Sequence, residues 1–415
     1  MPDPSPQSAP DAPDPERGPL AGLLVVDLTR ALAGPQAAMM LGDLGARVVK
    51  VEAPGGDDTR AWGPPWASES GDPAVAGEGR HDSTYFMAAN RNKESIVLDL
   101  REPGDAALLA RLVARADVLL ENFRAGVLDR LGFPIPRLHE LNPRLVVGSI
   151  TGFGHDGPEA GRGGYDQIAQ GEGGLMSVTG IDEATKVGVP IADLLAGMNL
   201  AYGVLAALHE RSRTGRGRVV RTSLLASVVA AHAFQGTRWT IAGETPGRSG
   251  AHHPAIAPYG LFATPTGPLQ VAVGSEGLWR DFAACLGLDP GQPRFATNQE
   301  RVAHRAELVA EIERAFAAQP EADWLALLLA AGIPAGRVRT IPEVYAGEQA
   351  RSQGLAMRVD HPAYGPLTLP GSALRFEDAS HSGGRSVPLP PPLLDEHGPA
   401  IRAWLAEPGD EAAPG

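Results

Sequence analysis

The sequence predicts an α/β protein whose larger part is a doubly wound parallel sheet with helices on both faces. Short apolar runs with β-branched residues alternate with helical stretches between about residues 20 and 150. Of the 415 residues, 43% are hydrophobic and 20% are charged, a balance typical of globular proteins. The chain is longer than an ordinary domain, so we expect more than one domain.

The elements of this alternation can be placed in order. Strands are expected at 23–28, 47–52, 95–100, 118–123 and 144–150. Helices are expected between them at 35–46, about 103–116, 126–131 and 136–141. Apolar positions then repeat at helical spacing along 193–213, and 218–233 predicts a strand followed by a helix. Strand, helix and strand in succession favour parallel pairing.

Beyond about residue 235 the pattern changes. Two strands are expected within 257–275, helices at 278–286, 301–317 and 321–330, and short strands within 357–376. The predicted domains are a Pro- and Asp-rich disordered tail at 1–18, a large Rossmann-like domain at 19–234, a small α+β domain at 235–356, a C-terminal return to the large domain at 357–405, and a flexible tail at 406–415.

Composition excludes several classes of protein. The formal net charge is -13, and no basic surface typical of nucleic-acid binding is evident. Cys285 is the single cysteine, which excludes a disulfide framework and a cysteine-ligated zinc site. The first residues lack the pattern of a signal peptide, and no run of 18 apolar residues occurs. We therefore expect a cytoplasmic protein with no metal, nucleic-acid or membrane partner.

Basic residues gather near the ends of two predicted strands in this acidic chain. They are Arg91, Lys93, Arg101, Arg124 and Arg130. Local positive charge indicates an anionic ligand, because arginine and lysine pair well with phosphate. The alternative is that these side chains are solvated loop charges, or arginines that complement helix C-termini. The residues alone leave both interpretations open.

Two further segments are candidates for chemistry. The turn at 27–36 follows the first strand and opens a helix, where α/β sheets often hold phosphate, but it contains neither a G-x-G-x-x-G motif nor a P-loop. Asp193 opens a long helix, so its carboxylate is expected among free backbone N–H groups and should stay ionised. An ionised aspartate can be a nucleophile. It can equally be a simple helix cap.

Several long motifs follow one another along the chain. They are VVDLTRALAGPQAAMMLGDLGARVVKVEAPGGDDTR (25–60), NRNKESIVLDL (90–100), DVLLENFRAGVLDRLGF (117–133), LNPRLVVGSITGFG (141–154), GGYDQIAQGEGGLMSVTG (163–180) and IADLLAGMNLAYGVLAALHERSRTGRG (191–217), with shorter ones at 253–264, 330–338 and 390–398. In this order they resemble the family III CoA-transferases, a family that includes formyl-CoA transferase, succinyl-CoA-dependent dicarboxylate transferases, carnitine CoA-transferase and α-methylacyl-CoA racemase.

The resemblance implies roles for particular residues. Asp193 stands at the position of the family's nucleophilic aspartate. The positions implied to contact coenzyme A are Leu32, Ala33, Leu98, Asp99, Leu100, Arg101, Asn122, Phe123, Arg124, Arg130, Gly164, Tyr165 and Asp166. The resemblance also implies an interlocked homodimer, with an acyl-CoA and a carboxylic acid as substrates and no metal.

The chain departs from its relatives at three places. Leu32 stands where formyl-CoA transferase has glutamine, and 248–254 replaces that enzyme's polyglycine loop, which argues against formyl or oxalate specificity. Tyr165 stands where the racemase has histidine, so a two-base proton exchange loses one partner. Segments 173–180 and 187–197 resemble the dicarboxylate-type members more than the formyl-type ones, which favours succinyl-CoA as donor and a dicarboxylate as acceptor.

The mechanism implied is covalent. Asp193 attacks the thioester to form an aspartyl anhydride, CoA thiolate returns to form an aspartyl-CoA thioester, and the acceptor acid takes over CoA. Backbone N–H groups at the helix N-terminus, or at Gly173 and Gly174, are candidate oxyanion donors. The alternatives are an acyl-CoA racemase or epimerase, with Asp166 or Asp193 as base, and a CoA-binding protein without turnover.

Overall fold

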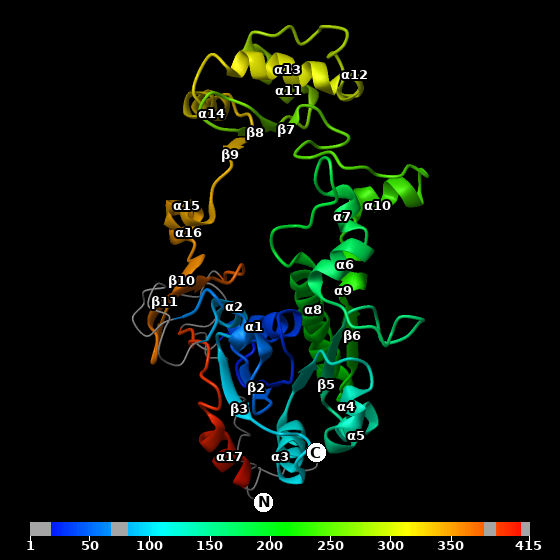
Figure 1. Cartoon of the computed structure of the whole chain (residues 1–415), viewed down its shortest axis with the longest axis vertical. Helices are drawn as coiled ribbons and strands as arrows, with labels where there is room; N and C mark the ends of the chain where they lie inside the picture. The colour runs from blue at the N-terminus through cyan, green and yellow to red at the C-terminus, as the bar shows by residue number, and fades with distance from the viewer. Residues whose placement is uncertain (1–17, 68–81, 377–386, 408–415) are drawn as a thin grey trace, which may run out of the picture. The chain divides into compact units, whose positions relative to one another are not determined.

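The computed structural model describes residues 18–67, 82–376 and 387–407. The chain, drawn in Figure 1, forms two compact units: unit 1 comprises Met1–Gly174, Val187–Phe234 and Gly347–Gly415, and unit 2 comprises Leu175–Lys186 and Gln235–Ala346. Residues 1–17 and 408–415, which make up nearly all of the two predicted tails, lie outside the described residues.

Unit 1 is built on a six-stranded sheet whose strands all pair in parallel. The strands are β1 (Leu24–Asp27), β2 (Arg47–Glu52), β3 (Lys93–Val97), β4 (Val118–Glu121), β5 (Val146–Thr151) and β6 (Val219–Ser223). Their order across the sheet is β3-β2-β1-β4-β5-β6. This order confirms the predicted doubly wound α/β fold, and it reverses direction between β1 and β4, where such folds bind ligands beyond the carboxyl ends of the strands.

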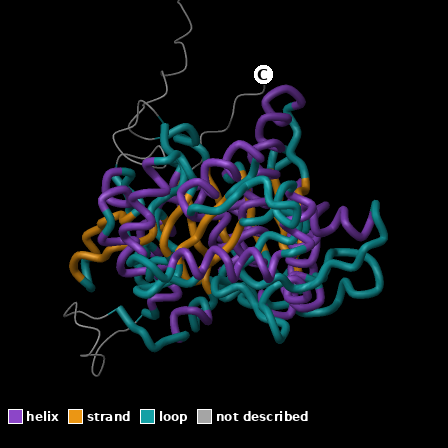
Figure 2. The backbone as a smooth tube through the Cα atoms, turned by 90° about the horizontal axis from the view of Figure 1, so that it is seen from above, coloured by secondary structure: helices purple, strands orange, loops and turns teal. Residues whose placement is uncertain are grey.

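Helices cover both faces of the sheet, and Figure 2 shows them on either side of the strands. On one face lie α1 (Ala33–Asp43), α2 (Thr84–Ala89) and α8 (Ile191–Thr214), with α6 (Asp166–Glu172) and α9 (Leu224–Ala230) packed against α8. On the other lie α3 (Pro103–Arg115), α4 (Val127–Arg130), α5 (Ile135–Leu141) and α17 (Gly398–Ala406), which share one apolar cluster with the strands. The short η1 (Asp58–Ala61) follows β2.

The C-terminal part of unit 1 adds α16 (Glu348–Ser352) and an antiparallel hairpin of β10 (Ala356–His361) and β11 (Gly365–Pro370). Arg91 lies beneath this hairpin, because its guanidinium donates to the backbone oxygen of Pro370 at 2.8 Å. The chain that follows the hairpin runs along β3, where the Asp395 carboxylate accepts the Val97 N–H at 2.7 Å. The C-terminal segments of unit 1 therefore pack against residues from the N-terminal part of the chain.

Unit 2 has its own small antiparallel sheet, in the order β7-β8-β9, and its own apolar cluster. The strands are β7 (Tyr259–Phe262), β8 (Leu269–Ala272) and β9 (Ala335–Arg337). The helices are α7 (Leu175–Val178), α11 (Glu276–Leu286), α12 (Asn298–Ala303), α13 (Arg305–Phe316), α14 (Glu321–Ala330) and α15 (Ile341–Ala346), and α10 (Ala233–Thr240) begins in unit 1.

Three local predictions were wrong. The strand expected at 95–100 is Lys93–Val97, and it begins earlier than expected because the charged side chain of Lys93 is buried in the sheet. The helix expected at 301–317 is divided at His304, which caps both α12 and α13. The strand expected at 118–123 stops at Glu121, which leaves Asn122 and Phe123 to form a turn.

Within the described residues, α8 is the one helix long and apolar enough to span a membrane by length and composition alone. It packs against α1, α9, β5 and β6 in unit 1. These contacts bury 39% of its most apolar stretch.

Candidate active site

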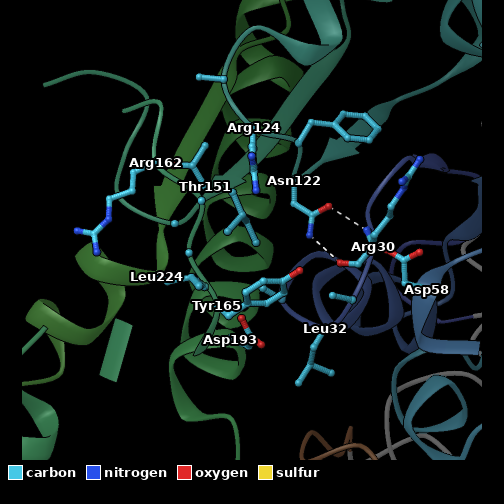
Figure 3. Close-up of a pocket in the computed structure, with 18 of the residues that line it drawn as sticks. Arg30, Leu32, Asp58, Asn122, Arg124, Thr151, Arg162, Tyr165, Asp193 and Leu224 are labelled. Atoms are coloured by element: carbon cyan, nitrogen blue, oxygen red, sulfur yellow. Dashed lines mark hydrogen bonds between the residues drawn. The ribbon is translucent and has the colours of Figure 1, made fainter. Parts of the chain in front are cut away.

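A pocket opens where the strand order reverses. It has a volume of about 220 Å³ and lies at the carboxyl ends of β1, β4 and β5, beside the start of α8. Figure 3 shows Asp193, Tyr165 and Leu32 around this space. The lining residues are Arg30, Ala31, Leu32, Ala33, Asp58, Trp62, Asn122, Phe123, Arg124, Ala125, Ile150, Thr151, Gly152, Ala160, Arg162, Gly163, Gly164, Tyr165, Asp193 and Leu224.

Asn122 joins the two turns on either side of the reversal. Its side-chain oxygen accepts the Arg30 N–H at 2.9 Å, and its amide nitrogen donates to the Arg30 backbone oxygen at 2.7 Å. Both bonds are drawn as dashed lines in Figure 3. The early end of β4 makes this clamp possible, because Asn122 belongs to the turn rather than to the strand. The turn after β1 is thus tied to the turn after β4.

Two glycines let the chain after β5 pass close to the chain before α6. A Cβ on Gly152 would lie 2.6 Å from the Gly164 nitrogen, and a Cβ on Gly164 would lie 2.8 Å from the Gly152 Cα. Any side chain at either position would push the two segments apart. This close approach places Tyr165, which is 68% exposed, on the wall of the pocket.

Asp193 lies in the first turn of α8, on the side that faces α1. Gly197 follows it by one helical turn, and a Cβ there would lie 2.6 Å from the Ala33 backbone oxygen. Residues four apart share a helix face, so this tight packing brings Asp193 close to the start of α1. The structure thereby joins the predicted nucleophile to the predicted first-turn residues Leu32 and Ala33.

The predicted electrostatics of Asp193 were wrong. The helix begins at Ile191 with Pro190 as its N-cap, so Asp193 lies inside the first turn and is not the N-cap residue. Burial, with a further contribution from the charge of Asp166, raises the pKa of Asp193 to about 7. The helix N-terminus therefore does not hold this carboxylate at an ordinary low pKa.

Asp166, rather than Asp193, provides the carboxylate that accepts a free N–H group at the start of α8. One of its carboxylate oxygens accepts the Ala192 N–H at 2.8 Å, and the other accepts the Gln170 side-chain amide at 2.7 Å. Asp166 therefore satisfies an N–H group in the first turn of α8, although it comes from α6. This leaves Asp193 beside a second carboxylate, and no ion pair to Asp193 occurs among the described residues.

A second cavity of about 510 Å³ adjoins the first, and Leu32 lines both. Its wall is mostly apolar and comprises Leu32, Gln36, Met39, Tyr85, Ala88, Arg91, Val189, Pro190, Leu194, Pro370 and Gly371. Burial, with smaller contributions from Asp193, Asp166 and Asp57, raises the pKa of Tyr85 to about 12. Tyr85 is therefore a neutral phenol within the electrostatic reach of Asp193.

The pattern of CoA-transferase family III matches residues 20–398, nearly the whole described chain. The chain belongs to CoA-transferase family III. It is 40% identical to a succinate–glutarate CoA-transferase of Agrobacterium fabrum over 401 residues, 93% of this chain and 96% of that protein. It is 38% identical to a mouse succinyl-CoA:glutarate CoA-transferase, over 91% of this chain and 84% of that protein.

A third relative is an acetyl-CoA:oxalate CoA-transferase of Acetobacter aceti, 36% identical over 94% of this chain and 97% of that protein. Among solved structures, a CaiB/BaiF family protein from Brucella suis matches with a TM-score of 0.81 and 40% identity, covering 94% of this chain and all of that one. The protein is therefore a CoA-transferase that uses CoA thioesters as co-substrates.

The predicted CoA-contacting positions of this CoA-transferase divide into two groups. Those in the turns after β1 and β4 and before α6 line the pocket: Leu32, Ala33, Asn122, Phe123, Arg124, Gly164 and Tyr165. The remaining ones do not line it: Leu98, Asp99, Leu100, Arg101, Arg130 and Asp166. Contact with CoA stays a prediction for both groups.

The basic cluster of the sequence is not one site. Arg91 and Lys93 are buried and pair with Asp43 at 2.6 Å and Asp27 at 2.9 Å. Arg101 is exposed and pairs with its neighbour Asp99. Arg130 ends the short helix α4, as expected for a residue that complements a helix C-terminus. Arg124 alone among these five lines the pocket.

Gly173 and Gly174 do not supply oxyanion donors here. Their N–H groups donate to the backbone oxygens of Ala169 at 2.8 Å and Gly171 at 3.1 Å, which completes the end of α6. Within the described ranges, no three His, Cys, Asp or Glu side chains are grouped as metal ligands.

Sequence reasoning missed several residues of the pocket wall. Arg30, Trp62 and Arg162 add positive and aromatic groups to it. Arg30 carried a usable signal, since it directly follows the first strand, at the edge where α/β sheets bind ligands. Trp62 and Arg162 reach the pocket from loops whose path the local sequence does not specify.

Proposed function

We propose that this enzyme moves CoA from succinyl-CoA to a dicarboxylic acid, with Asp193 as the covalent carrier. The observation that carries the proposal is the location of Asp193 in the pocket at the strand-order reversal, with a pKa raised to about 7. A carboxylate that is a stronger base than usual, yet still substantially ionised near neutral pH, suits a nucleophile. The names of the glutarate-specific relatives support the dicarboxylate.

Each half-reaction balances without an external base. An oxygen of Asp193 attacks the thioester carbon, the C–S bond breaks, and CoA leaves as thiolate, which gives a mixed anhydride. The thiolate then attacks the Asp193 carbonyl carbon and releases the donor as its carboxylate. The acceptor carboxylate attacks the resulting aspartyl thioester, and the same steps in reverse deliver CoA to it. The CoA thiolate expelled as each anhydride forms is the nucleophile that cleaves that anhydride, the donor departs as a free carboxylate, and Asp193 is released as a carboxylate at the end.

The burial of Asp193 favours this chemistry. Burial disfavours the ionised carboxylate, as the raised pKa shows, whereas the acylated and thioesterified side chains carry no charge. The cost of placing an anion in the pocket is therefore relieved when the covalent bond forms. Asp166 adds to this effect, because its charge lies close to that of Asp193.

The cationic wall of the pocket suits the phosphates of CoA. Arg30 and Arg124 are exposed at its edge, and the Arg30 guanidinium lies 5.6 Å from the centre of the Phe123 ring. Guanidinium groups bind phosphate oxygens with two donors at once. We assign the adjoining cavity to the acyl chain, because it is mostly apolar and contains Gln36 and Tyr85 as hydrogen-bonding groups for a distal carboxylate.

The test is to trap the intermediate. After incubation with succinyl-CoA, mass spectrometry of peptides from the quenched enzyme should locate a CoA or succinyl adduct on Asp193. Asp193→Asn should show no adduct and no exchange of CoA between acids. The surface carboxylate variant Asp360→Asn is the matched control and should behave as the wild type. An adduct on another residue, or turnover by Asp193→Asn, would overturn the proposal.

The enzyme is also proposed to act as a cytoplasmic homodimer. Large apolar side chains are exposed on three neighbouring helices of unit 1: Ile168 on α6, Met198 and Tyr202 on α8, and Val229 on α9. Tyr202 is 75% exposed. An exposed apolar face of this kind is typical of an interface. Light scattering should report two chains for the wild type and one chain for Tyr202→Asp, and a monomeric wild type would contradict the assignment.

A further inference from the structure

The turn after β1 is held by one neighbouring side chain and by side chains from distant parts of the chain. The N–H of Thr29 donates to Asp27 at 2.9 Å, and both backbone polar groups of Arg30 bond to Asn122. This turn leads directly into Leu32 and Ala33, which line the pocket beside Asp193. Its conformation therefore determines one wall of the site.

Lys50 and Asp57 supply the remaining bonds to this turn. The Lys50 ammonium donates to the Thr29 backbone oxygen at 2.9 Å and to the Asp57 carboxylate at 2.9 Å. The other oxygen of Asp57 accepts the Ala31 N–H at 3.3 Å. Both side chains are only 1% exposed. One buried ion pair thus bonds to a carbonyl and to an N–H group of the same short turn.

The turn needs such support because Ala31 has a φ of +64°. Residues other than glycine rarely adopt this left-handed conformation, since the Cβ approaches the following carbonyl oxygen. A conformation of this kind persists only where the surrounding structure determines it strongly. The Asp57 carboxylate bonds to the N–H of Ala31 itself, so it acts at the strained residue.

The use of lysine in this chain points to the same place. Lysine occurs only at positions 50, 93 and 186, although lysine and arginine together number 36. Lys93 is fully buried beneath the same turn, and its ammonium donates at 2.9 Å to Asp27, Asn90 and the Pro35 backbone oxygen. A compact ammonium donates to three acceptors that surround it in a small closed space, whereas the larger guanidinium of arginine needs its acceptors close to one plane.

We propose that Lys50 and Asp57 are positioning residues of the acyl-CoA site, because together they fix the Thr29–Ala31 turn so that Leu32 and Ala33 face Asp193. That the ligand is an acyl-CoA rests on the proposed function, whereas the contacts that hold the turn do not depend on it. The competing explanation is that the pair only stabilises the sheet, in which case the shape of the turn is independent of it.

The test removes both charges together, as Lys50→Met with Asp57→Leu. Replacing a buried ion pair by apolar side chains of similar size is often neutral for stability, whereas removing one partner leaves an uncompensated charge. Because Asp57 also accepts the Thr59 N–H and hydroxyl at the start of η1, we expect a folded protein with a somewhat lower melting temperature than the wild type. Hydrogen exchange should nevertheless become faster in a peptide spanning residues 28–34, and the Kd for CoA should rise about tenfold, which corresponds to ~1.4 kcal/mol.

Arg47→Met is the matched control. Arg47 lies on β2 like Lys50 but pairs with Glu94 at the opposite end of the strand, where both side chains are partly exposed. It should leave exchange at 28–34 and CoA affinity unchanged. If the double variant does not fold, the comparison is between Asp57→Ala and Asp57→Asn. Exchange at 28–34 should be fastest in the alanine variant and slower in the asparagine variant, whose side-chain oxygen still accepts the Ala31 N–H although its amide nitrogen cannot accept from Lys50.

A folded double variant with unchanged exchange and unchanged CoA affinity would overturn the positioning role, as would equal exchange in the alanine and asparagine variants. Failure of the wild type to bind CoA would instead overturn the proposed function. In that case the exchange measurement still decides whether Lys50 and Asp57 fix the turn.

Discussion

The two faces of the six-stranded sheet differ sharply, although they are made by alternate residues of the same strands. Val26, Val49 and Ile96 point to the face covered by α3, α5 and α17, and they belong to one large apolar cluster. Asp27 and Lys50, their neighbours in sequence, are paired in register between β1 and β2 and are fully buried. The first face is an apolar core, and the second contains buried charges.

The two faces therefore contribute differently: the apolar face stabilises the sheet, and the charged face orients particular groups. Apolar contacts have no preferred direction, so the α3 face can stabilise the sheet without fixing any particular group. Hydrogen bonds between buried charges and backbone atoms are directional, and they bind only one arrangement well. The charged face includes Asp27 at the end of β1, from which the chain continues into the turn that lines the pocket. Four predictions test this division of roles, beginning with the variant that is expected to change stability most.

The largest effect is expected from Arg60→Met on the charged side. Arg60 is buried and pairs with Glu52 at 2.7 Å and with Asp82 at 2.9 Å. The substitution leaves two carboxylates without their partner, so the free energy of unfolding should fall by about 4 kcal/mol. Urea unfolding measures this. The exposed pair of Arg137 and Glu140 is the control, and Arg137→Met should cost less than about 1 kcal/mol.

Leu112→Ala tests the apolar face. Leu112 lies on α3 and is fully buried in the apolar cluster, so its truncation should lower the free energy of unfolding by about 3 kcal/mol. The kcat/KM per folded molecule should not change. Leu108→Ala, on the same helix but partly exposed, should cost less. A large change in KM for the acyl-CoA in Leu112→Ala would mean that the two faces do not divide stability and positioning as described.

Asp193→Asn tests a charge that has no cationic partner among the described residues. The pKa of Asp193 rises from 3.8 to about 7 on folding, so folding favours the protonated carboxyl. The free energy of unfolding therefore decreases as the pH rises from about 4 through 7. At about 1.4 kcal/mol per pKa unit the bound is ~4 kcal/mol, and partial exposure reduces our expectation to ~2 kcal/mol. Asp193→Asn should therefore be more stable than the wild type at pH 8, but not at pH 4. Thermal unfolding at the two pH values decides it.

The smallest effect is expected from Asp166→Asn. The wild-type kcat/KM should rise with pH, reach half its maximum near pH 7, where Asp193 is half ionised, and level off above that pH. Burial is the main cause of the raised pKa and the charge of Asp166 a lesser one, so the variant should move this limb to lower pH by less than about one unit. The asparagine oxygen can still accept the Ala192 N–H, so the fold should persist. An unmoved limb would show that the two carboxylates do not interact.

The alternation of strands and helices predicted the sheet correctly, because buried parallel strands are short apolar runs with β-branched residues. It failed where polar residues enter the sheet. Lys93 and Glu94 fall outside the predicted strand because the sequence shows their charges but not the Asp27 carboxylate and the Arg47 guanidinium that they meet across the strands. Partners that are distant in the chain cannot be found from local composition.

For the site, sequence motifs indicated Asp193, the first turn and the turn after β4, and the fold brings these together in one pocket. The sequence did not predict that Asp166 would take the N–H group at the start of α8, nor that Asp193 would be left beside it with a raised pKa. Both depend on how α6 packs against α8. A pKa follows from burial and from neighbouring charges, which are properties of the folded chain.

By itself, the sequence determined the α/β class, the order of most elements and the family to which the enzyme belongs, because these follow from local periodicity and from long ordered motifs. Only the tertiary structure decided which charges are buried with a partner and which remain at the pocket. Lys50 and Arg30 are both basic residues near a strand end, yet one is sealed beneath a turn and the other lies on the pocket wall. The physical reason is that the surroundings of a charge are set by segments far away in the chain.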